Sequence, residues 1–399
     1  MGTQTDTASR LARLAVVNGR LVLPDRIVEG LALVVEDDRI AGITSTGDVG
    51  SDTTMIDAGG RLVIPGLVDI HTHGGRGVTF NEPTADAFGS ILAMNAEAGV
   101  TSVLGTLGGV TIAETVTCLD FGRGWQRSAP PGSARLIGMH LESPYIEPAQ
   151  AGALDPAGIR RADDGSAEPL FEHTAILRIL MLAPELPGAL ELVERLAGRG
   201  VVVAAGHTRA KEEQVVAAIE RGLSHVTHIW SAMTMTVREG AWRKPGLVET
   251  ALVDGRLTVE MIADNRHLPP TLMKLATKCI EPERLCVVSD AATGAGLPEG
   301  SRLKLGPVDF EVRDGVGMLL DGSAFAGSTT LLGQMLPVLR DVVGLPLVDA
   351  VRMCTLTPAR VAGWDDRVGS LAPGKLADII ILDEHLAPAR VMIGGRWIK

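Results

Sequence analysis

The stretch "RLVIPGLVDIHTHGG", which runs from Arg61 to Gly75, carries two histidines at the end of an apolar segment. His71 and His73 are two of only nine histidines in a chain of 399 residues. If the segment is a buried strand, residues two apart point to the same side, so both imidazoles face one place. The pair is a weak signal alone, and its meaning depends on the rest of the chain.

Downstream of this stretch, short apolar runs alternate with Ala- and Leu-rich helical segments. This alternation is typical of a parallel βα array. Helical stretches such as 85–99 and 210–222 end in glycine, a common signal at helix C-termini. We expect eight strands, at 66–70, 101–107, 135–141, 177–183, 201–206, 225–229, 258–263 and 284–290. Eight repeats without a GxGxxG motif after the first strand predict an α/β fold, a (β/α)8 TIM barrel, rather than a doubly wound sheet.

The two ends of the chain have a different texture from the middle. Short β-rich runs separated by Gly and Asp turns fill residues 14–64, and similar runs separated by Gly and Pro turns return in 369–399. This pattern predicts a small β-sandwich domain built from both termini. We therefore expect a sandwich made of 1–64 and 354–399, with the barrel at 65–353.

Composition excludes several classes of partner. The net charge of −11 disfavours nucleic acid and anionic membranes, and aromatic residues, which stack single-stranded nucleic acid, make up only 3% of the chain. No apolar run is long enough to span a membrane, and the N-terminus lacks a signal-peptide core. The four cysteines form no CxxC pair. These features predict a cytoplasmic protein that acts on a small molecule.

Polar side chains follow five of the expected strands at their C-terminal ends, the face on which TIM-barrel active sites are built. A single histidine there is more often a structural residue, and we expect this of His140, His173, His225 and His385. Five strand ends of this kind together favour a site. The residues at those ends are His71, His73, Glu142, His207, His228 and Asp290.

Imidazoles and carboxylates in this combination suit a divalent metal. Zinc is expected first, with iron, cobalt, nickel and manganese as alternatives, because all of them accept mixed nitrogen and oxygen ligands. Ligand type alone leaves the choice between one and two ions open. A bound metal lowers the pKa of water and polarises a carbonyl, which hydrolysis of an unreactive amide requires.

Motifs along nearly the whole chain resemble those of the amidohydrolase superfamily and, within it, the N-acetylglucosamine-6-phosphate deacetylases. The run from "HTHGG" through "HLESP" to "GHT" is the most specific part. The other matching segments are "APE", "THIWSAM", "MIADNRH", "VVSDAATGAG", "GSTTLL", "TLTPARVAG" and "GSLAPGKLADIIILD".

The resemblance implies a role for each matching residue. Glu142, His207 and His228 match the principal metal ligands, and His71 and His73 match a pair that holds a second metal in some members. Asp290 matches the catalytic aspartate, a metal-site residue that takes a proton from water and passes it to the leaving amine. His267 matches a substrate-binding histidine. Arg243 matches the phosphate-binding arginine that one subunit of a homodimer donates to the other, a task that suits guanidinium.

The chain departs from the family pattern around the substrate. Leu154 stands where the family has a histidine that binds the acetyl carbonyl, and leucine cannot donate a hydrogen bond. Ser231, before Ala232, replaces an asparagine near the substrate, Ser143 replaces a glycine, and Arg266 adds a cation beside His267. These changes predict that hydrolytic chemistry is kept while recognition of the substrate is altered. Arg266 or a second metal are candidates to replace the lost donor.

Three functions remain open from the sequence. The first is deacetylation of an N-acetyl amino sugar, with N-acetylglucosamine 6-phosphate as the expected substrate. The second is hydrolysis of another N-acyl or cyclic amide at the same metal centre, which Leu154 and Ser231 favour. The third is a catalytically silent homologue that only binds, which the presence of all six candidate metal and base residues disfavours.

Overall fold

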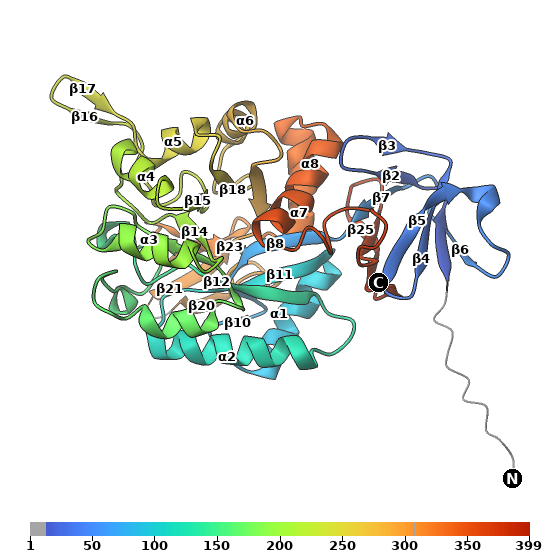
Figure 1. The fold of residues 1–399 in the computed structure, drawn as a ribbon, viewed down its shortest axis with the longest axis horizontal. Coiled ribbons are helices and arrows are strands. Elements are labelled where there is room, and N and C mark those ends of the chain that lie inside the picture. The colour runs from blue at the N-terminus through green and yellow to red at the C-terminus, as the bar shows by residue number, and fades with distance from the viewer. Residues whose placement is uncertain (1–12, 306–307) are drawn as a thin grey trace, which may run out of the picture.

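A computed structural model describes residues 13–305 and 308–399 of the chain. The first twelve residues, which belong to the expected 1–64 segment and bear on the expected lack of a signal peptide, lie outside this description. Figure 1 shows a barrel with helices around it and a separate β domain beside it. None of the helices within the described ranges is long and apolar enough to cross a membrane.

The barrel contains the eight predicted strands, all parallel and in chain order around the sheet. Their interiors are nearly all buried, as expected for parallel strands covered on both faces. The TIM-barrel prediction is confirmed. The strands are β8 (Leu67–Thr72), β11 (Val100–Leu107), β12 (Arg135–Leu141), β13 (Leu177–Leu182), β14 (Val202–Ala205), β15 (Leu223–Val226), β18 (Thr258–Ile262) and β19 (Leu285–Val288).

The first and last barrel strands meet at a seam just below the barrel mouth. Beyond the end of β19, the Asp290 N–H donates to the His71 carbonyl at 2.9 Å, and the His73 N–H donates to the Ala291 carbonyl at 2.8 Å. The buried carboxylate of Asp69 accepts from the N–H groups of His71, at 3.2 Å, and Ser289, at 3.3 Å. Closure of the barrel therefore fixes the backbone that carries the histidine pair.

Helices cover the outside of the barrel. The first begins at an N-cap, where the Thr84 side chain accepts from the Ala87 N–H at 3.2 Å, and the second begins with a capping box formed by Thr111 and Glu114. Between β12 and β13 the chain forms only short 3-10 turns, at 148–150, 156–158 and 168–173. The helices are α1 (Ala85–Glu97), α2 (Ile112–Ser128), α3 (Ala189–Ala197), α4 (Glu212–Ile219), α5 (Leu247–Val253), α6 (Pro270–Cys279), α7 (Leu332–Pro337), α8 (Leu347–Met353) and α9 (Leu356–Val361).

Three β elements interrupt the βα alternation, and the sequence prediction did not include them. A short antiparallel pair, β9 (Gly74–Gly75) and β10 (Val78–Thr79), lies between β8 and α1. A hairpin of β16 (Val237–Glu239) and β17 (Trp242–Lys244) projects from the barrel beyond α4 and α5 (Figure 1). An antiparallel sheet follows β19 and leads back to the mouth of the barrel. Its strands are β20 (Arg302–Leu305), β21 (Val308–Arg313), β22 (Val316–Leu319) and β23 (Phe325–Ser328).

The second domain consists of two sheets that share one apolar core, and strands from both ends of the chain contribute to it. This confirms the predicted sandwich, whereas the boundaries at 64/65 and 353/354 stay predictions. One sheet contains β1 (Leu14–Val17), β4 (Leu31–Glu36), β5 (Arg39–Ser45) and β6 (Thr54–Asp57). The other contains β2 (Arg20–Val22), β3 (Ile27–Val28), β7 (Leu62–Pro65), β24 (Ile379–Leu382), β25 (Pro388–Ile393) and β26 (Arg396–Trp397).

Candidate active site

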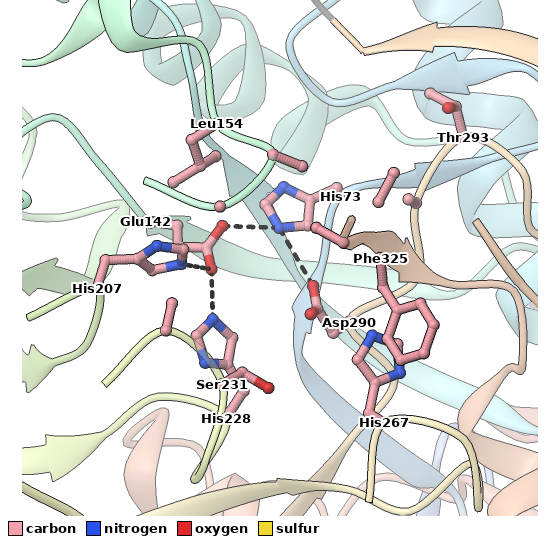
Figure 2. Close-up of a pocket in the computed structure, with 18 of the residues that line it drawn as sticks. His73, Glu142, Leu154, His207, His228, Ser231, His267, Asp290, Thr293 and Phe325 are labelled. Carbon is pink, nitrogen blue, oxygen red and sulfur yellow. Dashed lines mark hydrogen bonds and ion pairs between the residues drawn. The ribbon is translucent and has the colours of Figure 1, made fainter. Parts of the chain in front are cut away.

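Six predicted residues converge at the mouth of the barrel. Each lies at the C-terminal end of its strand, so the topology brings together side chains that are up to 219 positions apart in the sequence (His71 to Asp290). Five of them are drawn with their contacts in Figure 2. The six are His71, His73, Glu142, His207, His228 and Asp290.

Glu142 is the centre of this group (Figure 2). Its Oε1 lies 2.8 Å from Nε2 of His228 and 3.3 Å from Nε2 of His207. Its Oε2 lies 3.0 Å from Nε2 of His73. One carboxylate thus faces imidazoles on two sides, the arrangement that a bridging ligand requires.

The ligand atoms form two clusters at the mouth. Glu142, His207 and His228 form one, and His71, His73 and Asp290 form the other, with the atoms of each cluster within 4.8 Å of one another. Nε2 of His71 lies 3.3 Å from Nε2 of His73, and Oδ1 of Asp290 lies 3.5 and 3.4 Å from these two nitrogens. The structure therefore brings the predicted ligands together.

The pKa shifts of the clustered groups indicate whether a metal cation suits the two clusters. Burial lowers the pKa of His73, but Glu142 and Asp290 override it and raise that pKa to about 9. Burial raises the pKa of Glu142, yet His71 and His73 hold it well below its usual range. The carboxylates thus hold positive charge on the imidazoles. A divalent cation supplies the same charge in place of protons, so the donor set fits a metal.

Asp290 is ionised in this environment. Burial raises its pKa and Glu142 acts in the same direction, but His71 and His73 lower the pKa below its usual value. The carboxylate lines the cavity, beside His73 (Figure 2). It is therefore available to accept a proton.

The backbone at three site residues adopts the left-handed region. His207, His228 and Asp290 have φ values of 44°, 22° and 47°. Non-glycine residues adopt this conformation at a cost and are found where surrounding contacts hold them, commonly at functional sites. At His207 the ring is fixed by a hydrogen bond from Nδ1 to the Gln150 carbonyl at 2.7 Å.

A third group of polar residues lies directly behind the mouth. Glu260, on β18, has no exposed surface, and its carboxylate faces Nδ1 of His71 at 2.8 Å and Nε2 of His225 at 3.0 Å. Burial raises the pKa of Glu260, but His71 and His225 hold it well below its usual range. His140 is also buried here, and burial lowers its pKa to about 3. Sequence reasoning missed Glu260, although an acid inside the apolar strand "TVEMIA" was a usable signal, because a buried charge needs partners.

A cavity of about 230 Å³ opens above the clusters. Of the predicted substrate residues, Leu154, Ser231, Ala232 and His267 line it. Within the described part of the chain, no lysine or arginine does. Sequence reasoning missed several lining residues that come from β10, from loops and from the inserted sheet, among them Thr79, Asn81, Thr293 and Phe325.

The two predicted arginines lie elsewhere. Arg266 is exposed, and its Nε donates to the Asp314 carbonyl at 2.6 Å, on a turn of the inserted sheet. Arg243 is exposed on β17 of the projecting hairpin (Figure 1). The structure therefore does not bring either guanidinium into the cavity of its own chain.

His267 is held at the cavity wall by a buried acid. Its Nδ1 lies 2.7 Å from Oδ2 of Asp264, which also accepts from the Ser328 hydroxyl at 2.9 Å. Burial lowers the pKa of His267, but Asp264 overrides this effect and raises it. The ring meets the ring of Phe325 edge to face, with centroids 4.8 Å apart. His267 is thus a fixed group that favours positive charge, in a cavity to which residues 13–305 and 308–399 contribute no lysine or arginine.

Comparison with known proteins agrees with this geometry. The N-acetylgalactosamine-6-phosphate deacetylase of Escherichia coli O157:H7 is 32% identical over 84% of this chain and 87% of its own. The N-acetylglucosamine-6-phosphate deacetylase of Homo sapiens is also 32% identical, over 86% of this chain and 84% of its own. The crystal structure of N-acetylglucosamine-6-phosphate deacetylase from Pasteurella multocida superposes with a TM-score of 0.90 at 25% identity, covering 96% of this chain and 99% of that one.

A family model described as "Amidohydrolase family" matches residues 62–398. The match includes every barrel strand and all six residues of the two clusters. The chain belongs to the Amidohydrolase family.

Proposed function

We propose that this protein removes the acetyl group from an N-acetylhexosamine 6-phosphate, with N-acetylglucosamine 6-phosphate as the first substrate to test. It is an amidohydrolase, an enzyme of non-peptide C–N bonds, and its family is metal-dependent. The observation that carries the proposal is the position of Glu142 between two ligand clusters, with an ionised aspartate at the edge of the same cavity. The names of its relatives supply the substrate class.

The metal ligands in this proposal are Glu142 and the histidines of the two clusters. Glu142, His207 and His228 would hold one cation, and His71 and His73 would hold a second where one is bound. A bound cation, zinc first among the candidates, supplies a water molecule of lowered pKa and polarises the amide carbonyl.

Asp290 carries the proton in this mechanism. As a carboxylate it accepts a proton from the attacking water, and it then donates that proton to the nitrogen of the leaving amine. His267, held by Asp264, binds the substrate at the other side of the cavity. Ser231 and Ala232 contribute to the wall between them.

The acyl end of the cavity differs from the family pattern. Leu154 is half-buried in the cavity wall, and one of its methyl groups lies beside Gly108, as do His73 and Glu142. Removal of one donor to a reacting carbonyl costs about 10²–10³ in rate unless another group takes over. Arg266 is bonded to the inserted sheet, so a second cation is the better candidate for this replacement.

Phosphate recognition in this proposal requires a second subunit. The cavity has no lysine or arginine among the described residues, and Arg243 projects away on its hairpin. We infer a homodimer in which Arg243 of each chain reaches the substrate of its partner. A guanidinium grips phosphate oxygens bidentately, which a lone imidazole such as His267 cannot do. A charged sugar phosphate also suits a cytoplasmic enzyme, because such compounds do not cross membranes freely.

A second candidate function is hydrolysis of a different N-acyl substrate at the same centre. Leu154 favours it, because an apolar side chain stands where the family has a polar group. Ser231 also favours it, because a short hydroxyl replaces the amide of the family's asparagine. The variant Leu154→His distinguishes the two. If Leu154 is a departure in specificity, the variant should gain activity on N-acetylglucosamine 6-phosphate.

The direct experiment is an acetate-release assay with the metal-loaded protein. The substrates are the 6-phosphates of N-acetylglucosamine and N-acetylgalactosamine, their unphosphorylated forms, and a panel of N-acetyl amino acids. The proposal predicts turnover of one or both phosphates, with kcat/KM at least tenfold above that of the free sugars. Turnover confined to the amino acids would replace it with the second candidate.

A further inference from the structure

Glu260 connects the metal clusters to the barrel behind them. Its side chain is fully buried and lies on the opposite side of His71 from the cavity, since Nδ1 of that ring faces Glu260 and Nε2 faces the clusters. Its Oε2 is 2.8 Å from Nδ1 of His71 and also accepts from the backbone N–H of His228 at 3.2 Å. Its Oε1 is 3.0 Å from Nε2 of His225.

These contacts determine which ring nitrogens carry hydrogen. An ionised carboxylate only accepts hydrogen bonds, so Nδ1 of His71 and Nε2 of His225 both donate to Glu260. Because Nδ1 of His71 keeps its hydrogen toward Glu260, the nitrogen left to lose its proton to a metal is Nε2, the atom that faces His73, Glu142 and Asp290. A histidine that binds a metal needs this tautomer.

The same carboxylate joins three barrel strands. His71 belongs to β8, His225 to β15, and Glu260 itself to β18, while His228 follows β15 by two residues. Through His71 the carboxylate contacts one ligand cluster, and through the His228 N–H it contacts the other. Thr258 supports the outer end, with its hydroxyl 2.7 Å from Nδ1 of His225.

We propose that Glu260 is a positioning residue of the metal centre, which fixes the tautomer and orientation of His71 and anchors the backbone of His228. It does not touch the substrate cavity and is not a lining residue. The proposal concerns metal binding alone, so it holds or fails independently of which N-acyl substrate the enzyme uses.

One competing reading of these atoms is a separate metal site. His71, His140 and Glu260 also offer three ligand atoms within 4.8 Å of one another. Against this reading, the Glu260 oxygens already accept three hydrogen bonds, from Nδ1 of His71, Nε2 of His225 and the N–H of His228. An ion at this place would require Nδ1 of His71 to lose its hydrogen.

The first test compares Glu260→Gln with wild type in metal content and in metal affinity, measured by competition with a chelator on the whole protein. The amide of Gln has one accepting oxygen and one donating NH₂ group. The NH₂ group would face a donor, either a ring N–H of His71 or His225 or the backbone N–H of His228, and the repulsion would disturb the orientation of the His71 ring. Loss of such an outer partner weakens metal affinity about 10–100-fold. Glu260→Asp, which keeps the charge but shortens the side chain, should recover part of the affinity.

Asp378→Asn is the matched control. Asp378 is also a buried acid that accepts two hydrogen bonds, from Arg135 at 2.9 Å and from the Gly394 N–H at 2.9 Å, but it lies at the junction with the sandwich. It should lower thermal stability and leave metal affinity unchanged. If Glu260→Gln lowers thermal stability to a similar extent yet binds metal like wild type, Glu260 is only structural and the proposal is wrong.

A second measurement needs no variant at Glu260. In the zinc-loaded protein, ¹H–¹⁵N NMR of the histidine side chains should show a slowly exchanging proton on Nδ1 of His71, assigned by its loss in His71→Asn. A proton on Nε2 of His71, or none on either nitrogen because an ion sits between His71 and Glu260, would overturn the proposal.

Discussion

Asp290 shows how single residues in this site depend on their surroundings. It lies partly buried among two histidines and a second carboxylate, and it stays ionised because the imidazoles outweigh burial and the like charge of Glu142. It lines the cavity, but it is not part of the cluster formed by Glu142, His207 and His228. Its charge and its position together suit a proton acceptor.

Asp290→Asn should nearly abolish turnover, because an amide cannot accept a proton from water at neutral pH. A reduction of kcat by about 10²–10⁴ is expected for loss of a general base. The Glu142 cluster should still bind metal, so elemental analysis of the variant should show at least one ion per chain. A variant that keeps most of its kcat would mean that another group is the base.

His267 leads to a prediction on pH. Its pKa is raised because Asp264 outweighs burial, so the imidazole keeps its charge to a higher pH than a free histidine does. The KM for a phosphorylated substrate should therefore rise as pH rises through this pKa, above 6.5. In Asp264→Asn the rise should begin at lower pH. Measurement of KM from pH 5.5 to 9 tests this, with an unphosphorylated sugar, whose KM should not follow the same profile, as the control.

Among single residues, those that could be predicted from the sequence are the ones that stand at the end of a barrel strand. Four such residues lie at the C-terminal ends of barrel strands, and the barrel fold fixes their positions at its mouth. They are His71, Glu142, His207 and Asp290. Arg266 was expected beside the substrate, but its direction is set by the carbonyl of Asp314, 48 positions away on a sheet that sequence reasoning did not predict. Glu260 was missed for a related reason, since its partners lie on two other strands.

At the scale of elements, the barrel strands were predictable and the insertions were not. Eight apolar runs followed by helical segments leave few alternatives to a closed parallel barrel. The strands β20–β23 do carry a signal, an alternating pattern with turns at Asp314-Gly315 and Asp321-Gly322. That signal was overlooked because eight strands already accounted for a barrel. The consequence was that Phe325, at the start of β23, was absent from the expected cavity wall.

The hairpin β16–β17 is the element that tests the proposed dimer. Arg243→Ala should raise the KM for a phosphorylated substrate at least tenfold and leave the KM for the unphosphorylated sugar unchanged, because only the phosphate needs the guanidinium. Arg238→Ala is the matched control, since Arg238 pairs with Arg243 across the hairpin and its Nε donates to the Gly240 carbonyl. If both variants raise the KM equally, Arg243 contributes only its positive charge and does not bind the phosphate directly.

At the scale of the whole molecule, the sandwich and the barrel are joined by a partly buried ion pair. Nη1 of Arg135, at the start of β12, donates to Oδ2 of Asp378 at 2.9 Å, and the Asp378 side chain is only 3% exposed. Both domains could be predicted from their patterns of apolar runs and turns. The sequence gave no sign of this ion pair, because it links residues 243 positions apart.

Arg135→Ala should lower the free energy of unfolding by about 1–3 kcal/mol, because it removes one of the two hydrogen-bond donors that the described residues supply to a buried carboxylate and leaves the Gly394 N–H. The value of kcat should stay within twofold of wild type, since the pair lies outside the cavity. Urea unfolding and steady-state kinetics on the same preparation measure both. Unchanged stability would mean that water replaces the guanidinium at this junction.

The central claim is that metal bound at Glu142 and its histidines hydrolyses an N-acetylhexosamine 6-phosphate. The most direct test is elemental analysis of the purified protein, followed on the same sample by acetate release from N-acetylglucosamine 6-phosphate before chelation, after chelation and after return of zinc. We expect one or two ions per chain, loss of turnover on chelation and its recovery with metal. Stoichiometric metal with no turnover of either N-acetylhexosamine 6-phosphate would contradict the proposed substrate, and turnover that survives complete removal of metal would contradict the mechanism.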